Sequence, residues 1–208
     1  MNLKILSLVI IGVCILLPDV CYAFLSKDVH LLNMQNGLAD NTVSAVYKDK
    51  EGFVWFGTRN GLSRYDGRQI TNFEQSNSYP SISNLKEVFD GVLAFVDNGV
   101  FSAFDLKKER FLSVVSSSGQ GIPSRGMLQR NDSLVWVISG SELHLMKRCA
   151  SKEGELRLRI QEKYTGWDNQ DNLLVAITYS SDKKSICLID EKGRIILLDT
   201  TNLNSFRV

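Results

Sequence analysis

The 208-residue sequence is poor in the residue types from which most catalytic and metal sites are built. It contains two histidines, His30 and His144, which lie far apart, and four cysteines, and no two of these residues have metal-ligand spacing. The sequence also lacks a glycine-rich phosphate loop and a serine in a nucleophile-elbow context. These absences predict a protein without catalytic residues, without a metal site and without a cofactor.

The sequence also lacks an excess of one charge, because its 24 lysines and arginines nearly balance its 23 aspartates and glutamates. Nucleic-acid binding needs clustered basic residues, so no nucleic-acid partner is predicted. Proline occurs only at Pro18, Pro80 and Pro123, and the last two lie in polar linkers. No stretch has a convincing helical period, and residues 157–163 alternate between apolar and polar with the period of a strand. The sequence therefore predicts an all-β fold.

Long apolar runs are limited to one, Ile5–Leu17, near the N-terminus. Pro18 interrupts this run, and Cys21-Tyr22-Ala23 then reads as a small-residue cleavage site. A membrane span needs about 20 apolar residues, so the run is short for one. We predict a cleaved signal peptide at residues 1–23, which would export a mature chain to the periplasm. An uncleaved signal anchor is the alternative.

The sequence is rich instead in short strand-like runs separated by turns, most clearly from Gly37 to Asp66. Asn60-Gly61 suits a tight hairpin because both residue types tolerate positive φ. Four antiparallel strands in about 35 residues have the size and order of one β-propeller blade. The predicted strands are Val43–Lys48, Phe53–Gly57, Leu62–Tyr65 and Gln69–Phe73.

This stretch resembles the two-component regulator propeller repeat through Gly37-Leu38, Asn41, Val43, Asp49, Gly52, Trp55, Gly57-Thr58, Gly61-Leu62 and Tyr65-Asp66. The resemblance implies the periplasmic sensor region of a hybrid two-component system of Bacteroides-type bacteria. In that family, propellers and a β-sandwich respond to oligosaccharides, and a cytoplasmic histidine kinase passes the signal on. The sequence stops before a second propeller, the sandwich, the membrane span and the kinase. We therefore expect either the N-terminal fragment of a longer sensor, anchored in the inner membrane when complete, or a truncated relic.

Fainter copies of the repeat follow the first. Aligning Asn98-Gly99 with Asn60-Gly61 gives a shift of 38 residues, and Trp136 lies 81 residues after Trp55. The resemblance and these spacings predict a partial β-propeller over residues 24–208, with about four blades that are each a four-stranded antiparallel meander. Trp55 and Trp136 are predicted to lie in the core, and Trp167 to be exposed. The predicted blades cover residues 41–74, 82–115, 125–164 and 171–208.

Two cysteines remain after the leader, Cys149 and Cys187. Cys149 lies in a charged insertion at residues 147–155, which we predict to be a long hairpin loop. Export permits a disulfide between the two cysteines, which would join neighbouring blades. Two separate buried thiols are the equal alternative.

In a propeller, the loop before the innermost strand and the turn between the second and third strands open on one face. Polar residues of these segments can satisfy sugar hydroxyls, and an aromatic residue such as Tyr79 can stack on a sugar ring. The alternative is that they are ordinary turn residues, chosen for backbone geometry. Arg59 is the best candidate, because a long cation in a tight turn has no local backbone role. The predicted ligand-binding residues are Asn41, Arg59, Asn60, Asn84, Asp97, Asn98 and Ser139.

Enzymatic arrangements are weak by comparison. Asp97 and Asp105 could form an acid and base pair, but both lie at turns, and turn geometry already accounts for aspartate at these positions. His144, between Leu143 and Leu145, is predicted to be a strand residue that faces solvent.

We therefore expect an oligosaccharide-binding or scaffolding part of a sensor, completed by further blades or domains of a longer chain. The alternatives are an exported propeller module unrelated to signalling, or a fragment of a propeller-based glycan lyase or hydrolase. The open edges of a partial propeller also predict aggregation or pairing into a homodimer.

Overall fold

The computed structural model describes residues 31–74, 81–165, 172–200 and 206–207. The chain divides into two compact units, residues 1–32 and residues 33–208, and the second holds all the strands described here. The predicted signal peptide lies outside the described residues, as do His30, Tyr79 and Trp167. Within the described ranges, no helix is long and apolar enough to cross a membrane.

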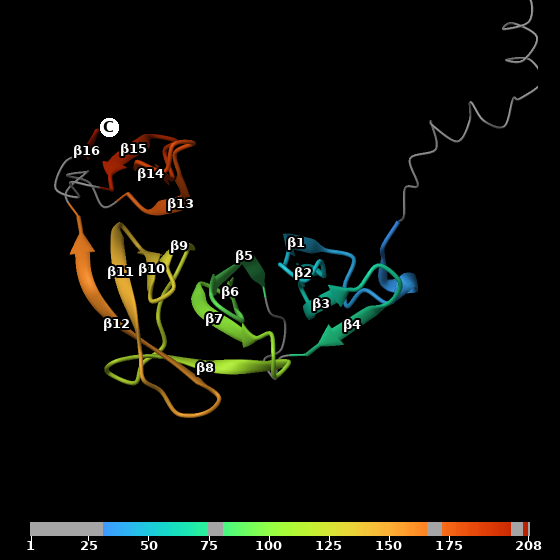
Figure 1. Ribbon diagram of the computed structural model, residues 1–208. Helices are drawn as coiled ribbons and strands as arrows, with labels where there is room; N and C mark the ends of the chain where they lie inside the picture. Colours follow the sequence, from blue (N-terminus) through green and yellow to red (C-terminus); the bar gives the residue numbers. More distant parts are fainter. Residues whose placement is uncertain (1–30, 75–80, 166–171, 201–205, 208) are drawn as a thin grey trace, which may run out of the picture. The chain divides into compact units, whose positions relative to one another are not determined.

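The described residues form sixteen β-strands and one short 3₁₀ helix, so the all-β prediction is confirmed (Figure 1). The strands follow one another as four antiparallel meanders. The first meander follows the helix η1 (Met34–Asn36) and contains β1 (Val43–Lys48), β2 (Val54–Thr58), β3 (Gly61–Tyr65) and β4 (Ile70–Phe73). The second contains β5 (Ile82–Phe89), β6 (Val92–Asp97), β7 (Val100–Asp105) and β8 (Arg110–Ser116). The third contains β9 (Gly126–Asn131), β10 (Leu134–Ser139), β11 (Glu142–Cys149) and β12 (Glu155–Tyr164). The fourth contains β13 (Leu174–Tyr179), β14 (Ser185–Asp190), β15 (Ile195–Asp199) and β16 (Phe206–Arg207).

Two predicted hairpin turns are present but differ in their backbone. Asn98 and Gly99 both have positive φ, 48° and 81°, as a type I′ turn requires. At the turn between β2 and β3, Gly61 alone takes positive φ, at 112°. A Cβ added to Gly61 would lie 2.6 Å from the carbonyl oxygen of Phe73, so this position needs glycine for space as well as for φ.

The second and third meanders share one sheet, which the sequence did not predict. Residues 155–158 of β12 pair in parallel with residues 113–116 of β8, so these two meanders form one eight-stranded sheet. The charged insertion is shorter than predicted, because β11 runs to Cys149 and β12 begins at Glu155. β12 is the outer strand of its meander, and its first residues pair both with β11 and with β8, the edge strand of the preceding meander.

The core lies between successive meanders rather than within any one of them. One apolar cluster combines Trp55 and Leu62 with Phe95 and Phe104, and it joins the first meander to the second. Similar clusters join the second to the third and the third to the fourth. Trp55 and Trp136 are each 1% exposed, which confirms their predicted core positions.

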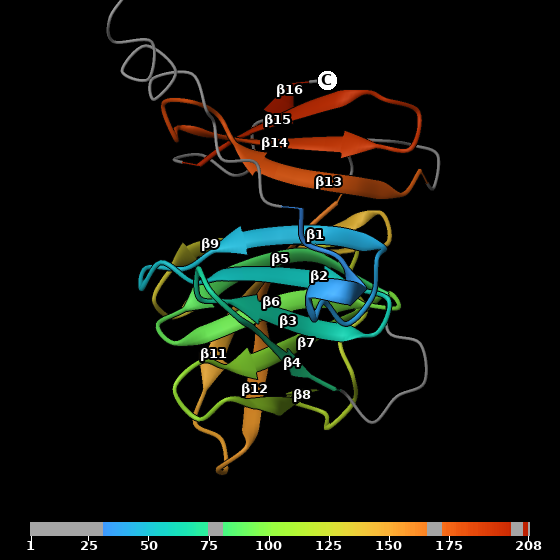
Figure 2. The ribbon, with the colours of Figure 1, turned by 90° about the vertical axis from the view of Figure 1, so that its right-hand side faces the viewer.

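The first strand of each meander contacts the first strand of the next one. β1 packs against β5, β5 against β9, and β9 against β13 (Figures 1 and 2). These four strands therefore line one common surface, to which all the repeats contribute side chains.

Candidate ligand-binding site

The predicted ligand-binding residues lie where the loop before a first strand meets the turn between the second and third strands. Around Asn60 the two segments touch, because its side-chain amide donates to the carbonyl of Ala39 at 3.4 Å. The Asn60 backbone N–H in turn donates to the Thr58 hydroxyl at 3.1 Å. Asn41 accepts a hydrogen bond from the Met34 backbone N–H at 2.9 Å. Both asparagines hold local backbone in place.

Asp97 and its neighbours have similar backbone roles in the second meander. Asp97 is 6% exposed, and its Oδ1 accepts from the Ser81 backbone N–H and the Asn98 side-chain amide, each at 3.1 Å. Asn84 takes a left-handed φ of 53° and donates to the Arg125 carbonyl at 3.0 Å, which links the second meander to the third. These residues position turns, and whether they also bind a ligand stays a prediction.

Arg59 and Ser139 complete the predicted set. Arg59 is exposed, and within the described residues its side chain has no hydrogen bond or ion pair. Ser139 is half-buried at the end of β10 and pairs with Glu142 across the hairpin. Binding by these two residues likewise stays a prediction.

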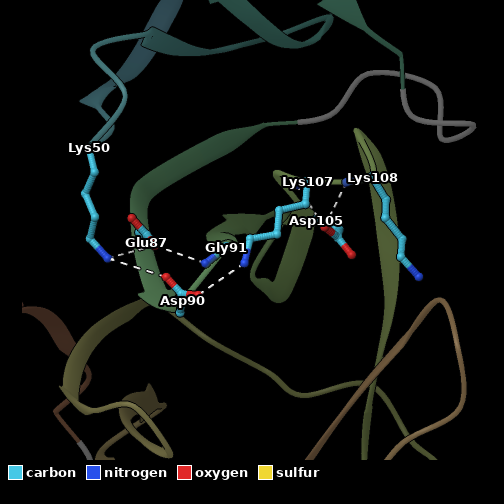
Figure 3. Close-up of polar contacts among 7 residues, drawn as sticks. All are labelled: Lys50, Glu87, Asp90, Gly91, Asp105, Lys107 and Lys108. Carbon is cyan, nitrogen blue, oxygen red and sulfur yellow. Dashed lines mark hydrogen bonds and ion pairs between the residues drawn. The ribbon is translucent and has the colours of Figure 1, made fainter.

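Two clefts lie at the opposite end of the first strands, and the first is filled with paired charges (Figure 3). This paired-charge cleft has a volume of about 340 Å³ and lies between the turns after β1 and β5. Lys50 Nζ is 3.2 Å from Glu87 Oε1 and 3.8 Å from Asp90 Oδ1, and Lys107 Nζ is 3.3 Å from Asp90 Oδ2. The Gly91 backbone N–H also donates to Glu87, at 3.1 Å.

The polar side chains in the inner wall of the paired-charge cleft also have hydrogen-bond or ion-pair partners. The indole N–H of Trp55 donates to Asp49 Oδ2 at 2.7 Å, while Asp49 Oδ1 accepts the backbone N–H groups of Glu51 and Phe53 at 3.0 and 2.9 Å. The Arg64 guanidinium carbon lies 4.8 Å from the centre of the Phe53 ring, and Arg64 also pairs with a glutamate, Glu109. Each of these polar groups has a partner from the chain itself.

The second cleft is larger, about 760 Å³, and the first strands of all four meanders contribute to it. Its volume falls in the range of small-molecule sites, roughly 300 to 1,000 Å³. Three cations line it, Lys86 on β5, Arg130 on β9 and Lys183 in the turn after β13. We call it the cationic cleft.

None of the three cations has a hydrogen-bonded or ion-paired carboxylate in the described part of the chain. The one carboxylate that lines the cationic cleft is Glu87, and it already pairs with Lys50 and accepts the Gly91 N–H. Positive charge is therefore concentrated on a concave wall, where a low-dielectric surface focuses the field.

A β-bulge places Arg130 in this wall. In the pairing of β9 with β10, Val135 lies opposite Gln129 and Leu134 opposite Asn131, so Arg130 is the extra residue. Bulges re-aim side chains, and the Arg130 guanidinium carbon lies 5.2 Å from the centre of the Trp136 ring. The guanidinium thus stacks on an aromatic face and keeps its N–H groups as donors.

Aromatic groups form the rest of the wall. The Tyr179 hydroxyl donates to the Gln129 carbonyl at 3.0 Å, and burial raises its pKa, while the nearby Trp136 indole lowers that pKa by a smaller amount. Burial also raises the pKa of Tyr47, and the charge on Glu87 adds to the rise. Both tyrosines are therefore neutral around pH 7. The buried Trp136 indole N–H makes no well-formed hydrogen bond, although it lies close enough to the Tyr179 hydroxyl to lower the pKa of that tyrosine.

Cys149 and Cys187 are both free thiols, on β11 and β14 of different sheets. The structure thus has the two separate cysteines and not the disulfide that export permits. Each cysteine sits within its own strand ladder, Cys149 opposite Arg157 and Cys187 opposite Thr178 and Leu197.

The prediction that His144 faces solvent is wrong, because this side chain is 7% exposed. β11 is an interior strand between β10 and β12, and the sheet is covered at this position. His144 Nε2 lies 2.6 Å from Glu142 Oε2, and this hydrogen bond, helped by Lys163, lowers the pKa of Glu142.

The carboxylates considered for acid and base chemistry lie apart. Asp97 pairs with Val100 at one end of the β6–β7 hairpin, and Asp105 pairs with Val92 at the other end. Within the described ranges, no group of three or more His, Cys, Asp or Glu side chains is arranged to hold a metal ion.

The residues of the cationic cleft were missed at the sequence level. Lys86 lies in the middle of β5, Arg130 near the end of β9 and Lys183 in the turn after β13. A cation within or soon after the first strand of each fainter repeat was the available signal. The predicted set instead came from the turns at the other end of the same strands.

Known proteins confirm the propeller identification. Residues 37–60 match the family model of the two component regulator propeller. No curated protein matches the sequence. Among solved structures, the WD40 β-propeller domain of Doa1 is 12% identical over 80% of this chain and 52% of that chain, with a TM-score of 0.54.

Two extracellular domains from B. thetaiotaomicron are also similar. That of BT4673, a proposed one-component system, is 14% identical, with a TM-score of 0.65, over 88% of this chain and 27% of that chain. That of BT3049, a proposed hybrid two-component system, is 20% identical, with a TM-score of 0.57, over 86% and 26%. The chain thus spans about a quarter of their length. At these identities the likeness shows the fold. The fold is a β-propeller fold, and the chain carries a two component regulator propeller repeat at residues 37–60.

Proposed function

We propose that this chain is a ligand-sensing part of an exported two-component sensor and that its ligand is an oligosaccharide. The observation that carries the proposal is the regulator propeller repeat at residues 37–60. The likeness of the described fold to the extracellular domains of BT4673 and BT3049 supports it.

The proposal places the chain in the periplasm, with residues 1–23 as the exporting leader. Signalling requires the kinase of a longer chain, in which a membrane span would anchor the sensor in the inner membrane. The propeller then contributes binding and shape, not chemistry. Asp97 and Asp105 lie at opposite ends of a hairpin, and His144 is hydrogen-bonded to Glu142, so these residues do not form an acid and base pair around a common site.

The test is a glycan panel applied to the chain expressed with its leader and purified from the periplasm. Plant and host oligosaccharides are added one at a time, and binding is measured by thermal shift and isothermal titration calorimetry. We expect at least one glycan to raise the melting temperature and to bind saturably at one site. A blank result across the panel would contradict the proposal.

Mass spectrometry of the same mixtures separates sensing from catalysis. A sensor returns each glycan intact, whereas a lyase or hydrolase releases shorter products. Released product that depends on the folded chain would favour the enzymatic alternative. Recovery of the chain from the cytoplasm alone, at its full uncleaved mass, would contradict the exporting leader.

A further inference from the structure

We propose that the cationic cleft binds the anionic group of an acidic oligosaccharide, either a uronic acid carboxylate or a sulfate ester. This inference rests on the proposed function and names the class of sugar. The carrying observation is the placement of Lys86, Arg130 and Lys183 on one concave wall without a carboxylate partner in the described residues.

Elsewhere in the described residues, several neighbouring charges are paired with carboxylates. Lys108 and Arg110 share Glu153, at 2.8 and 3.0 Å, and Arg194 binds Asp190 at 2.7 Å. The cationic cleft is the exception among the clefts described here. Because the whole sequence is nearly neutral, its excess of positive charge is local. An anion is the ligand that this field attracts.

The shape and donors of the cleft suit an anionic group on a sugar ring. Arg130 offers a planar fork of N–H donors, which fits the two oxygens of a carboxylate or two oxygens of a sulfate. Stacking of Arg130 on Trp136 holds this fork against the wall. Lys86 and Lys183 reach the cleft from the neighbouring meanders and add point charges.

The uncharged part of a sugar also finds partners in the cleft. Gln129 and Asn131 line it beside Arg130 and supply amide groups for hydroxyls. Tyr47 and Tyr179 supply apolar ring surface and neutral hydroxyls. A flexible neutral sugar would leave the three cations without partners, and an anion without a ring would leave the aromatic wall uncovered.

The experiment compares matched ligands on the full chain. Tri-galacturonic acid and neutral galactotriose have the same length and differ in the carboxylates, and a chondroitin sulfate tetrasaccharide adds sulfate esters. We expect the acidic trisaccharide to bind at least tenfold more tightly than the neutral one. Comparison of the chondroitin sulfate tetrasaccharide with its unsulfated counterpart, which keeps the glucuronate carboxylates, identifies which anionic group the cleft takes.

Variants test the cations individually. Arg130→Gln and Lys86→Gln remove the charge and leave a shorter, neutral polar side chain, and each should weaken binding of tri-galacturonic acid by roughly tenfold. Lys152→Gln removes the same charge from the exposed loop between β11 and β12 and should leave binding unchanged. Circular dichroism confirms that each variant is folded.

The NMR resonance of the Trp136 indole N–H gives a second measurement on the unmodified chain. Because Trp136 lines the cleft, its N–H signal should move on addition of tri-galacturonic acid, whereas the Trp55 signal should not. Acidic and neutral probes that bind equally, or an Arg130→Gln variant that binds like the parent chain, would overturn the cleft assignment but leave the proposed function standing. Absence of binding to every glycan would overturn both.

Discussion

Trp55 and Trp136 occupy corresponding positions in the first and third meanders, yet their surroundings differ. Both are 1% exposed, and each lies two residues after the residue that closes the first hairpin of its meander. The Trp55 indole N–H donates to Asp49, whereas the Trp136 indole N–H makes no well-formed hydrogen bond and has only the Tyr179 hydroxyl nearby. In the third meander Asn131 stands where the first has Asp49, and its Oδ1 accepts the Ser133 and Leu134 backbone N–H groups. Its other terminal atom is a donor and cannot accept from the indole.

The difference extends to the clefts beside each tryptophan. Near Trp55 each cation of the cleft, Lys50, Arg64 and Lys107, has a carboxylate partner from the chain, and the Lys50 and Lys107 pairs are drawn in Figure 3. Near Trp136 a bulge and an aspartate-to-asparagine difference leave cations without carboxylates. The first repeat thus satisfies its own cations, whereas the third leaves Arg130 without a carboxylate partner in the described residues.

The largest predicted effect concerns the space around Gly57 in the first meander. A Cβ at Gly57 would lie 2.5 Å from Ile82 Cγ2 and 3.3 Å from Ala45 Cβ, so Gly57→Ala should destabilise the chain by about 3 kcal/mol. Gly126, in the third meander, would place its Cβ 3.4 Å from Ile138, which is ordinary contact. Gly126→Ala should therefore change stability by less than about 1 kcal/mol. Urea denaturation at one protein concentration measures both, and equal losses would contradict the comparison.

Removing the indole N–H tests the tryptophans directly. Trp55→Phe deletes a hydrogen bond and leaves Asp49 Oδ2 unpaired, and should cost about 2 kcal/mol. Trp136→Phe removes the same ring area but no hydrogen bond, and should cost about 1 kcal/mol less. The measurement is the difference between the two free energies of unfolding. If Trp136→Phe lowered the free energy of unfolding more than Trp55→Phe, the Trp136 indole and not the Trp55 indole would be the one with the stabilising hydrogen bond.

An added acceptor for the Trp136 indole N–H should make the hydrogen bonding of the third meander resemble that of the first. Asn131→Asp keeps the oxygen that accepts the Leu134 N–H and adds a second acceptor for the Trp136 indole, for a gain of about 1 kcal/mol. The added carboxylate also lies next to Arg130 in sequence, so it should weaken tri-galacturonic acid binding. A variant with no gain in stability and an unmoved Trp136 N–H resonance would show that the indole points elsewhere.

The smallest effect is expected for single lysines of the two clefts. Lys107 pairs with Asp90 at the surface, and exposed pairs contribute little, so Lys107→Gln should lower the unfolding midpoint only slightly. Lys86→Gln relieves repulsion within the cationic cleft and should leave the midpoint unchanged or slightly raised. Repeating both melts in high salt should remove the difference, because salt screens both terms. A difference that persists in high salt would point to packing instead of charge.

Local sequence signals predicted much of the fold. β1 covers the same residues as the predicted strand Val43–Lys48, because a turn with Gly52 and a turn with Gly61 fix its hairpin neighbours. Trp55 and Trp136 were placed correctly because a large apolar residue in the second strand has one buried face to occupy. These are short-range rules of period and turn chemistry.

Features that depend on pairing between repeats were not predictable. His144 alternates with leucines as a solvent-facing residue would, but its strand lies inside an eight-stranded sheet. The parallel pairing of β8 with β12 depends on two outer strands that are separated by two hairpins. The cationic cleft gathers Lys86, Arg130 and Lys183 from three repeats, and the bulge that places Arg130 has no glycine to mark it.

The shared sheet of the second and third meanders has a mechanical consequence. At the other two junctions, neighbouring meanders meet mainly through side-chain packing and isolated hydrogen bonds, such as that from the Leu174 N–H to the Gly140 carbonyl. Between β8 and β12 the junction is backbone hydrogen bonding over residues 113–116 and 155–158. A force along these parallel strands is carried in shear by several bonds at once. Residues 82–164 should therefore respond to tension as one rigid segment, with the first and fourth meanders as the compliant ends.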